Sequence, residues 1–158
     1  MIRCEELTTE AFAPFGQVIE TPAGPGRAYF SEALESGRPG ARPSLSMAYR
    51  APSPLPLTAT TMERHQYSSQ SFVATDVSRW LVLVAPHAAT GGPDMSRARA
   101  FLPKPGQGIT FGADVWHHPL TVFDRPGTFA LFMWLDGSKT DEEFFTLPTP
   151  MLVEIDIR

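Results

Sequence analysis

Cysteine is almost absent from this chain of 158 residues, which contains one, Cys4. A single thiol excludes an intrachain disulfide framework and is typical of a reducing compartment, so we expect a cytoplasmic protein. No apolar run approaches the roughly 20 residues of a membrane-spanning helix, and residues 1–10 lack the apolar core of a signal peptide. We therefore expect no membrane partner, and a mobile N-terminus that leaves Cys4 without a catalytic role.

Basic runs are also missing, and the net charge is -4, which argues against nucleic acid as a partner. The sequence has no GxGxxG, P-loop, GxSxG or CxxC motif. These absences remove support for nucleotide-binding folds and for the common nucleophile elbows. The partner that we expect is a small-molecule substrate.

Proline and glycine, in contrast, are abundant, with 16 and 12 residues. So many turn-forming residues indicate short connections rather than long helices. The apolar fraction of 42% is sufficient for a core, and the length suits a single domain over residues 1–158.

Alternating and continuous apolar segments predict about nine strands separated by turn signals, a pattern typical of a β-sandwich or jelly-roll barrel. The predicted strands cover residues 16–20, 44–51, 57–65, 70–75, 80–86, 97–103, 108–111, 129–136 and 151–158. Thr8 caps a short helix predicted over 8–13, and residues 136–147 have room for one or two helical turns. The expected fold class is all-β, with one or two short helices.

Two segments have no clear place in this pattern. Residues 21–43 are rich in Gly, Pro, Ala and Arg and lack sustained periodicity, so we interpret them as a long loop excursion, either mobile or acting as a lid. The C-terminal strand 151–158 alternates, with Val153, Ile155 and Ile157 on one face. We expect it to be an exposed edge that a second copy of the chain can pair with.

Two adjacent histidines, His117 and His118, follow a tryptophan in the segment 111–123. Neighbours in a strand point to opposite faces, so only one of the two can face a barrel interior. The alternative is a structural histidine pair at the end of a strand. The other candidate residues of the chain decide between these interpretations.

Glu63 and His65 are two residues apart on a predicted strand and therefore share a face, and a turn brings Gln70 back beside them. Arg50 lies on the polar face of its predicted strand, and Lys104 lies in the turn before the second histidine segment. Each has an ordinary structural alternative, since buried polar groups also satisfy backbone groups and most cations are solvated. Trp116 has a core alternative, His87 is expected at the surface, and the acidic run near residue 141 on a solvated face.

The spacing Glu63-x-His65-x4-Gln70 imitates the metal-binding pattern of cupin barrels, in which two histidines and a glutamate bind a divalent metal and a second strand adds a histidine. Here Asp114-x-x-His117 stands for the Gly-x-x-His of that second strand, and aspartate tolerates a left-handed turn. This register makes His117 the inward residue. The tentative metal ligands are His65, His117, Glu63 and Gln70.

Longer segments resemble the ureidoglycolate lyase family, long called ureidoglycolate hydrolase. The resemblance covers about residues 7–147 and is weakest over 21–43. It rests on FAPFG at 12–16 followed by QVIE, ERHQYSSQSF at 63–72, WLVLVAP at 80–86, RAFLPKPGQGITF at 99–111 and VWHHPL at 115–120.

The resemblance implies a cupin-like β-barrel, usually a homodimer, that splits ureidoglycolate into glyoxylate and urea in allantoin and purine catabolism. It implies a carbon–nitrogen lyase of the amidine-lyase type and suggests a divalent metal, nickel in some members. Two positions depart from the family pattern. Some relatives carry His where this chain has Gly112, and many carry Arg where it has Gly137.

The residues suit that chemistry, which needs a base, an acid and a cation for the substrate carboxylate. His65, His117, His118 and Glu63 are the candidate catalytic groups. The candidate substrate-binding residues are Arg50, Gln70, Lys104 and Trp116, among which the guanidinium has bidentate geometry for a carboxylate. Two alternatives stay open: a non-catalytic cupin that binds a small organic acid, and a divergent metal-dependent cupin enzyme that acts on another 2-hydroxy or keto acid.

Overall fold

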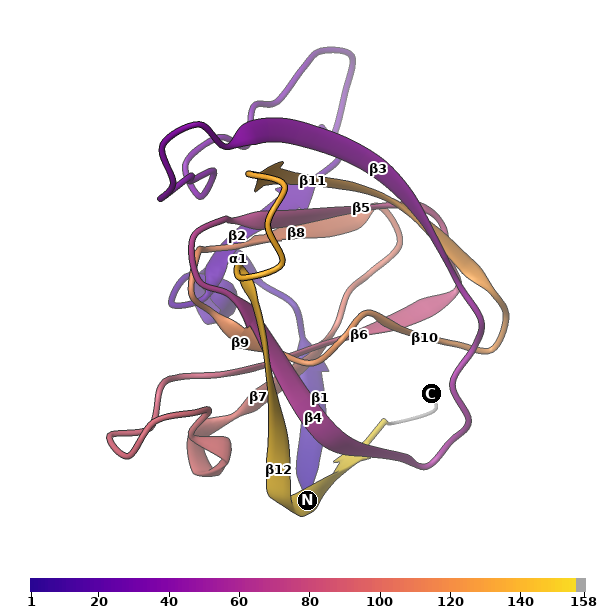
Figure 1. Cartoon of the computed structure of the whole chain (residues 1–158). Coiled ribbons are helices and arrows are strands. Elements are labelled where there is room, and N and C mark those ends of the chain that lie inside the picture. The colour runs from indigo at the N-terminus through magenta and orange to yellow at the C-terminus, as the bar shows by residue number, and fades with distance from the viewer. Residues whose placement is uncertain (156–158) are drawn as a thin grey trace.

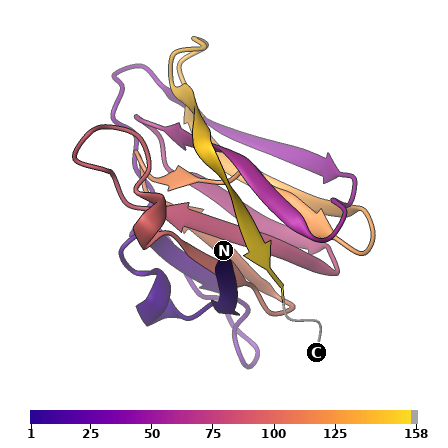
Figure 2. The same ribbon diagram turned by 90° about the horizontal axis from the view of Figure 1, so that it is seen from below.

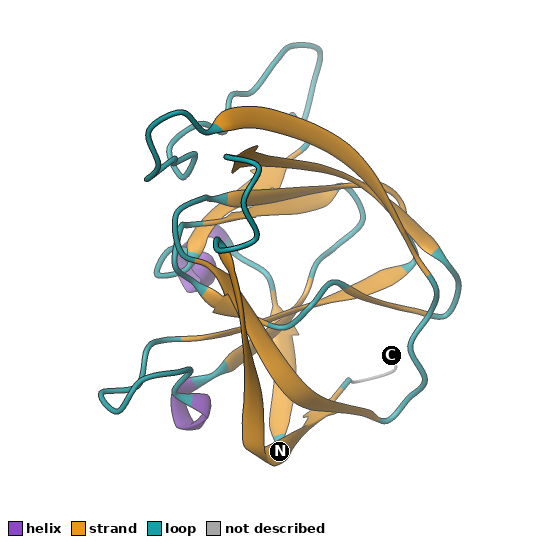
Figure 3. Cartoon of the chain, viewed as in Figure 1, coloured by secondary structure: helices purple, strands orange, loops and turns teal. Residues whose placement is uncertain are grey.

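The computed structural model describes residues 1–155 of the chain (Figure 1). Strands dominate these residues, and the helical segments are two short ones, as Figure 3 shows. The elements are β1 (Ile2–Glu6), α1 (Thr9–Phe12), β2 (Gly16–Glu20), β3 (Arg42–Arg50), β4 (Leu57–His65), β5 (Gln70–Asp76), β6 (Arg79–Ala85), the 3-10 helix η1 (Met95–Arg97), β7 (Arg99–Leu102), β8 (Gln107–Phe111), β9 (Trp116–His117), β10 (Thr121–Phe123), β11 (Gly127–Leu135) and β12 (Glu142–Glu154).

Two sheets form the architecture. One has the strand order β10-β6-β7-β1-β12-β4-β9, and β9 also pairs with β6, so that β6, β7, β1, β12, β4 and β9 close into a ring. The other has the order β2-β8-β5-β11-β3. Figure 2 shows the strands of both sheets from a second direction, with β12 lying along β4. The predicted all-β barrel is confirmed.

The core has two parts because strand β6 is buried on both faces. Trp80, Val82 and Val84 contribute to the cluster that includes the five-stranded sheet. The alternate residues Leu81, Leu83 and Ala85 contribute to the cluster that includes β4, β9 and β12. Burial on both sides explains the continuous apolar run of this strand, since a strand with one solvated face alternates.

The N-terminus is part of the barrel, so the expectation of a mobile terminus around Cys4 is wrong. Strand β1 lies parallel to both β7 and β12 and is paired with each of them. Cys4 is half-buried opposite Ala100. The strand is too short to show a period, and its partners lie about a hundred residues or more further along the chain.

Strand β12 overturns two further expectations. Residues 142–147 are part of a strand that begins at Glu142 rather than a helical turn. This strand lies between β1 and β4, so within residues 151–155 it is not an exposed edge. Its register shifts between Thr146 and Met151, a stretch that contains Pro148 and Pro150. These prolines divide the sequence pattern although the strand continues; Ile157 lies outside the described residues.

The predicted excursion is irregular up to Arg42, where β3 begins, apart from an isolated bridge between Ser36 and Ser68. It is tied to the turn between β4 and β5, since the Gly37 amide donates to the Tyr67 carbonyl at 2.7 Å. A role as a lid stays a prediction. Among the described residues, no helix has the length and apolar character needed to cross a membrane.

Candidate active site

Three polar side chains meet where β4 runs beside the short strand β9. Glu63 and His65 alternate with Arg64 on β4 and so share a face. His117 lies directly opposite Glu63 in the β4–β9 register, and opposite residues of paired strands also share a face. The sequence therefore brings the three side chains together through one strand period and one strand pairing.

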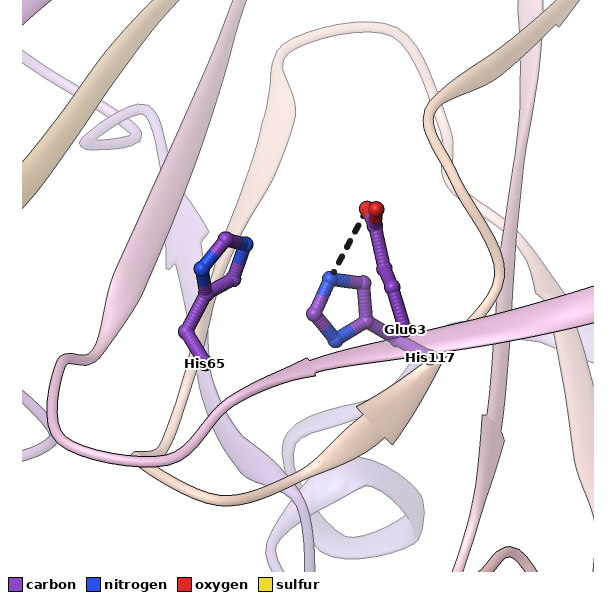
Figure 4. Close-up of side chains that lie close together, drawn as sticks. All are labelled: Glu63, His65 and His117. Atoms are coloured by element: carbon purple, nitrogen blue, oxygen red, sulfur yellow. Dashed lines mark ion pairs between the residues drawn. The ribbon is translucent and has the colours of Figure 1, made fainter. Parts of the chain in front are cut away.

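The cluster is tight and almost inaccessible to solvent. One ligand atom from each of Glu63, His65 and His117 lies within 4.8 Å of the other two. The two imidazole rings are stacked with centroids 5.8 Å apart, and Nε2 of His117 is 3.3 Å from Oε1 of Glu63 (Figure 4). His117 is 1% exposed, His65 7% and Glu63 9%.

The opposite sheet supplies a wall of the site. The ring of Phe111, at the end of β8, stacks on His117 with centroids 4.1 Å apart and an interplanar angle of 15°. Gln70 lies opposite Phe111 in the β5–β8 register, so its side chain is on the same face. Its Oε1 is buried and has no hydrogen-bond partner in the part of the chain that the structure describes. Gln70 is thus brought to the wall beside the cluster, where its Oε1 is available for hydrogen bonding while its Nε2 donates to Sδ of Met133 at 3.9 Å.

A left-handed turn delivers His117. Asp114 has φ of 67°, as predicted for a residue that stands where the cupin pattern has glycine. Its amide donates to the His65 carbonyl at 2.8 Å, which joins the turn to the end of β4. Nδ1 of His117 is 2.9 Å from the Val115 carbonyl oxygen, which only accepts, so Nδ1 carries a proton and Nε2 faces Glu63.

Burial and charge set the protonation of the cluster. Burial lowers the pKa of His65, and the neighbouring His117 lowers it further. Burial by itself raises the pKa of Glu63, but the close contact and charge of His117, together with the charges of His65 and His118, outweigh it, so the pKa is lowered overall. At neutral pH the site therefore contains a carboxylate beside an unprotonated His65.

The cluster fits a divalent metal ion. Two imidazole nitrogens and one carboxylate oxygen are the donors of many transition-metal sites. Nε2 of His117 is buried and has no hydrogen-bond partner among residues 1–155, so it is available to a cation. The residues that can hold an ion are Glu63, His65 and His117.

His118 lies beside the cluster rather than in it, as its alternation with His117 predicts. It is half-buried, and its Nδ1 is 3.0 Å from the Pro119 carbonyl oxygen and 3.2 Å from Oγ1 of Thr121. Burial lowers its pKa. Its position is that of a histidine that braces the segment after β9.

The structure does not bring the other three predicted substrate-binding residues to the cluster. Arg50 is exposed and pairs with Gly127 at one end of β3. Gln70 is near the other end of β3, because Gln70 and Ser44 both pair with Met133 of β11. Lys104 is exposed and forms an ion pair with Glu6. Trp116 is 1% exposed and packs inside the barrel, on the face of β9 opposite His117.

Asp141, which the sequence placed on a solvated face, lies against the site. Its Oδ2 is 3.4 Å from Nδ1 of His65, and its side chain is 12% exposed. The acidic run was predicted to be solvated because its composition is polar throughout, and no spacing relates Asp141 to a histidine 76 residues earlier. By contrast, His87 is exposed, as predicted, and its Nδ1 accepts from Nε1 of Trp116 at 3.2 Å.

Phe144 is a second residue that the sequence did not indicate. It lies opposite Glu63 in the β4–β12 register, and so on the same face, but it is 58% exposed. It therefore lies beside Glu63 on the strand across from the one that carries His117. A separate cleft of about 580 Å³ includes Asp114 and Val115 in its lining but none of the three cluster side chains.

Fold and site together define an all-β barrel protein with two histidines and a carboxylate gathered between its sheets. A solved structure with a similar fold is the dTDP sugar isomerase of Desulfovibrio desulfuricans G20, with a TM-score of 0.50. It is 14% identical and covers 85% of this chain and 82% of its own. At that identity the likeness concerns the fold alone.

The family model described as ureidoglycolate lyase matches residues 1–154. A putative ureidoglycolate lyase of Agrobacterium fabrum is 35% identical over 98% of this chain and 95% of its own length. The ureidoglycolate lyase of Chelativorans sp. is 36% identical over 93% of both chains. The chain belongs to the ureidoglycolate lyase family, and the resemblance seen in its motifs is confirmed.

Proposed function

We propose that this protein splits ureidoglycolate into glyoxylate and urea. The observation that carries the proposal is the buried Glu63, His65 and His117 cluster in a chain of this family. The reaction is a carbon–nitrogen bond cleavage of the amidine-lyase type. No feature of the structure favours the two alternatives, a non-catalytic organic-acid binder and an enzyme for another 2-hydroxy acid.

The chemistry needs two proton transfers at one carbon. Ureidoglycolate carries a hydroxyl, a carboxylate and the ureido nitrogen on that carbon. A base removes the hydroxyl proton, the oxygen lone pair forms the aldehyde C=O, and the C–N bond breaks with its electron pair on nitrogen. An acid then protonates that nitrogen, which leaves as urea, so the two proton transfers balance.

We assign these roles to the two clustered imidazoles. His65 is the base, since its lowered pKa keeps it unprotonated at neutral pH. We assign the acid to His117, since both its ring nitrogens face oxygen acceptors: Nδ1 faces the Val115 carbonyl, and Nε2 lies 3.3 Å from Oε1 of Glu63. The Gln70 amide offers both a donor and an acceptor to the ureido group.

The same three side chains bind a divalent ion in the alternative form of this proposal, with nickel among the candidates. Such an ion, held by these side chains, would supply Lewis-acid chemistry to the bound substrate. Glu63, His65 and His117 then act as ligands and not as proton carriers, because one lone pair cannot serve both purposes. Treatment of the protein with a chelator separates the two forms.

The test is a coupled assay for glyoxylate and urea from racemic ureidoglycolate. It uses protein stripped with a chelator, before and after addition of Ni²⁺, Mn²⁺ or Zn²⁺. We expect the two products in equal amounts; activity without metal supports the imidazole pair, and activity restored only by metal supports the ligand role. Absence of both products under every condition contradicts the proposed function.

We also propose that the protein is a cytoplasmic homodimer. The single cysteine supports a reducing compartment. Three apolar side chains of β3, a strand at the end of its sheet, support the dimer: Leu45 is 76% exposed, Met47 67% and Tyr49 65%. Such a contiguous apolar face is typical of a contact surface between subunits.

A further inference from the structure

Two buried polar atoms face each other behind His65. Nδ1 of His65 and Oδ2 of Asp141 are 3.4 Å apart, and neither has a hydrogen-bond partner elsewhere among the described residues. A buried polar atom without a partner is costly, typically about 1–3 kcal/mol. One proton on Nδ1, directed at the carboxylate, satisfies both atoms together.

Asp141 is fixed against the strand end that carries His65. Its Oδ1 accepts a hydrogen bond from the Tyr67 amide at 2.9 Å, and its carbonyl accepts one from the Gln66 amide at 3.1 Å. Both donors belong to the two residues that directly follow His65. The carboxylate is therefore positioned by the same turn that positions the imidazole.

The loop before Asp141 is held by hydrogen bonds from Arg38, which lies in the irregular segment before β3. The Arg38 guanidinium donates to Oδ2 of Asp136 at 2.5 Å, to Oγ of Ser138 at 2.7 Å and to Oγ1 of Thr140 at 3.0 Å. It also lies 4.2 Å from the centroid of the Tyr67 ring. This network holds the loop and limits the movement of Asp141.

We infer that Asp141 is a positioning residue that keeps the His65 proton on Nδ1 and the Nε2 lone pair turned toward Glu63 and His117. Figure 4 shows one nitrogen of the His65 ring toward the other two side chains and the other nitrogen turned away. The inference deepens the proposed function and rests on it for its catalytic meaning, because a base and a metal ligand both need that lone pair. A carboxylate on the remote nitrogen of a ligand histidine commonly fixes the tautomer in this way.

Asp141→Asn gives a sharp test because the side chain keeps its size. With Oδ1 still accepting from the Tyr67 amide, the new amide nitrogen faces Nδ1 of His65 and donates to it. The proton of His65 must then move to Nε2. Two-bond ¹H–¹⁵N correlation spectra of ¹⁵N-histidine-labelled protein should show the Nδ1–H tautomer for His65 in the natural chain and the Nε2–H tautomer in the variant.

Binding of Ni²⁺ alone, measured by titration calorimetry, is the second measurement. We expect Asp141→Asn to weaken it at least about tenfold, as loss of such an outer partner usually does. Glu143→Gln is the matched control: Glu143 follows Asp141 by two residues, on strand β12, but its carboxylate pairs with Arg64, so the tautomer and the affinity should not change.

An Nε2–H tautomer of His65 in the natural chain overturns the inference, even if the Asp141→Asn variant does not fold. So does an Asp141→Asn variant that folds with unchanged tautomer and Ni²⁺ affinity. Neither measurement uses ureidoglycolate, so they stand apart from the lyase assay. A chain with the expected tautomer and no lyase activity loses the proposed function and keeps the role of Asp141.

Discussion

At the scale of single residues, the site depends on imidazoles whose partners differ although their environments are similar. His65 and His117 are both buried between the sheets, but one faces Asp141 and the other faces Glu63 and a backbone carbonyl. His118, next in sequence, faces a different carbonyl and a threonine hydroxyl. Because a hydrogen-bond partner selects which ring nitrogen carries the proton, neighbouring histidines can have different roles.

Replacement of His117 is the direct test of the acid. We expect His117→Ala to lower kcat/KM for ureidoglycolate cleavage at least about 100-fold, in line with loss of a positioned acid–base group. Stopped assays of glyoxylate measure this. Near-normal turnover by His117→Ala would remove His117 from the mechanism.

At the scale of elements, the edge strand β3 turns its apolar side chains to solvent, whereas an ordinary edge strand turns them to the core. Its small and polar residues share a face with the inward residues of β11, whereas Leu45, Met47 and Tyr49 point to solvent. Phe132 and Ala130 lie opposite Leu45 and Met47 and extend the apolar face onto β11. Val73 of β5, which is 41% exposed, lies opposite Ala130.

This face predicts the effect of charge on assembly. We expect the natural chain to sediment as a dimer and the double variant Leu45→Glu, Met47→Glu to sediment as a monomer, because burying two carboxylates in an apolar contact is costly. Sedimentation velocity measures both. Leu152→Glu is the control, since Leu152 is a partly exposed leucine on strand β12. A dimer that survives the double substitution places the contact elsewhere.

Gly108 allows strands β8 and β5 to approach each other closely. A Cβ on Gly108 would come within 2.4 Å of the Phe72 carbonyl oxygen, because β8 and β5 approach closely there. We expect Gly108→Ala to separate the two strands that carry Phe111 and Gln70. The free energy of unfolding from urea titration should fall by more than about 1 kcal/mol, the cost of many core perturbations. Gly24→Ala is the control, as no atom of the described residues would lie within 4 Å of a Cβ added there.

At the scale of the whole molecule, the buried ionisable groups make stability depend on pH. His65 and His118 have lowered pKa values, chiefly because of burial. Burial raises the pKa of Glu63, but the neighbouring His117, His65 and His118 together lower it by more. Between the folded and unfolded pKa values, the unfolded chain binds more protons than the folded chain. The free energy of unfolding therefore rises with pH in that interval, and this contribution to stability is lost as the pH falls.

We expect acid to destabilise the fold in two steps. The two histidines lower the free energy of unfolding as the pH falls below their unfolded pKa of 6.5, and Glu63 lowers it further below its unfolded pKa of 4.5. Urea denaturation at pH 7.5, 6 and 5 measures the first step, and His118→Gln should reduce its slope. Equal unfolding free energies at all three values would contradict the expected protonation of the buried histidines.

Much of the fold was predictable because strand periodicity is local. The continuous apolar run at 80–86 indicates a strand buried on both faces, and Thr8 caps a helix where the sequence places one. The spacing of Glu63 and His65 also determines that they share a face. Strands β1 and β12 were mispredicted in part, since one is short and the other contains prolines, and pairing with distant partners maintains both.

The sequence by itself determined the all-β class and the family motifs, and it placed Glu63, His65 and His117 among its candidate site residues. Only the tertiary structure decided that Asp141 lies behind His65, that Phe111 stacks on His117, and that Arg50 and Lys104 lie away from these two histidines. The physical reason is range: alternation and turn chemistry act over a few residues, whereas the sheet that joins β4, β9 and β12 is specified by side-chain packing across the whole chain.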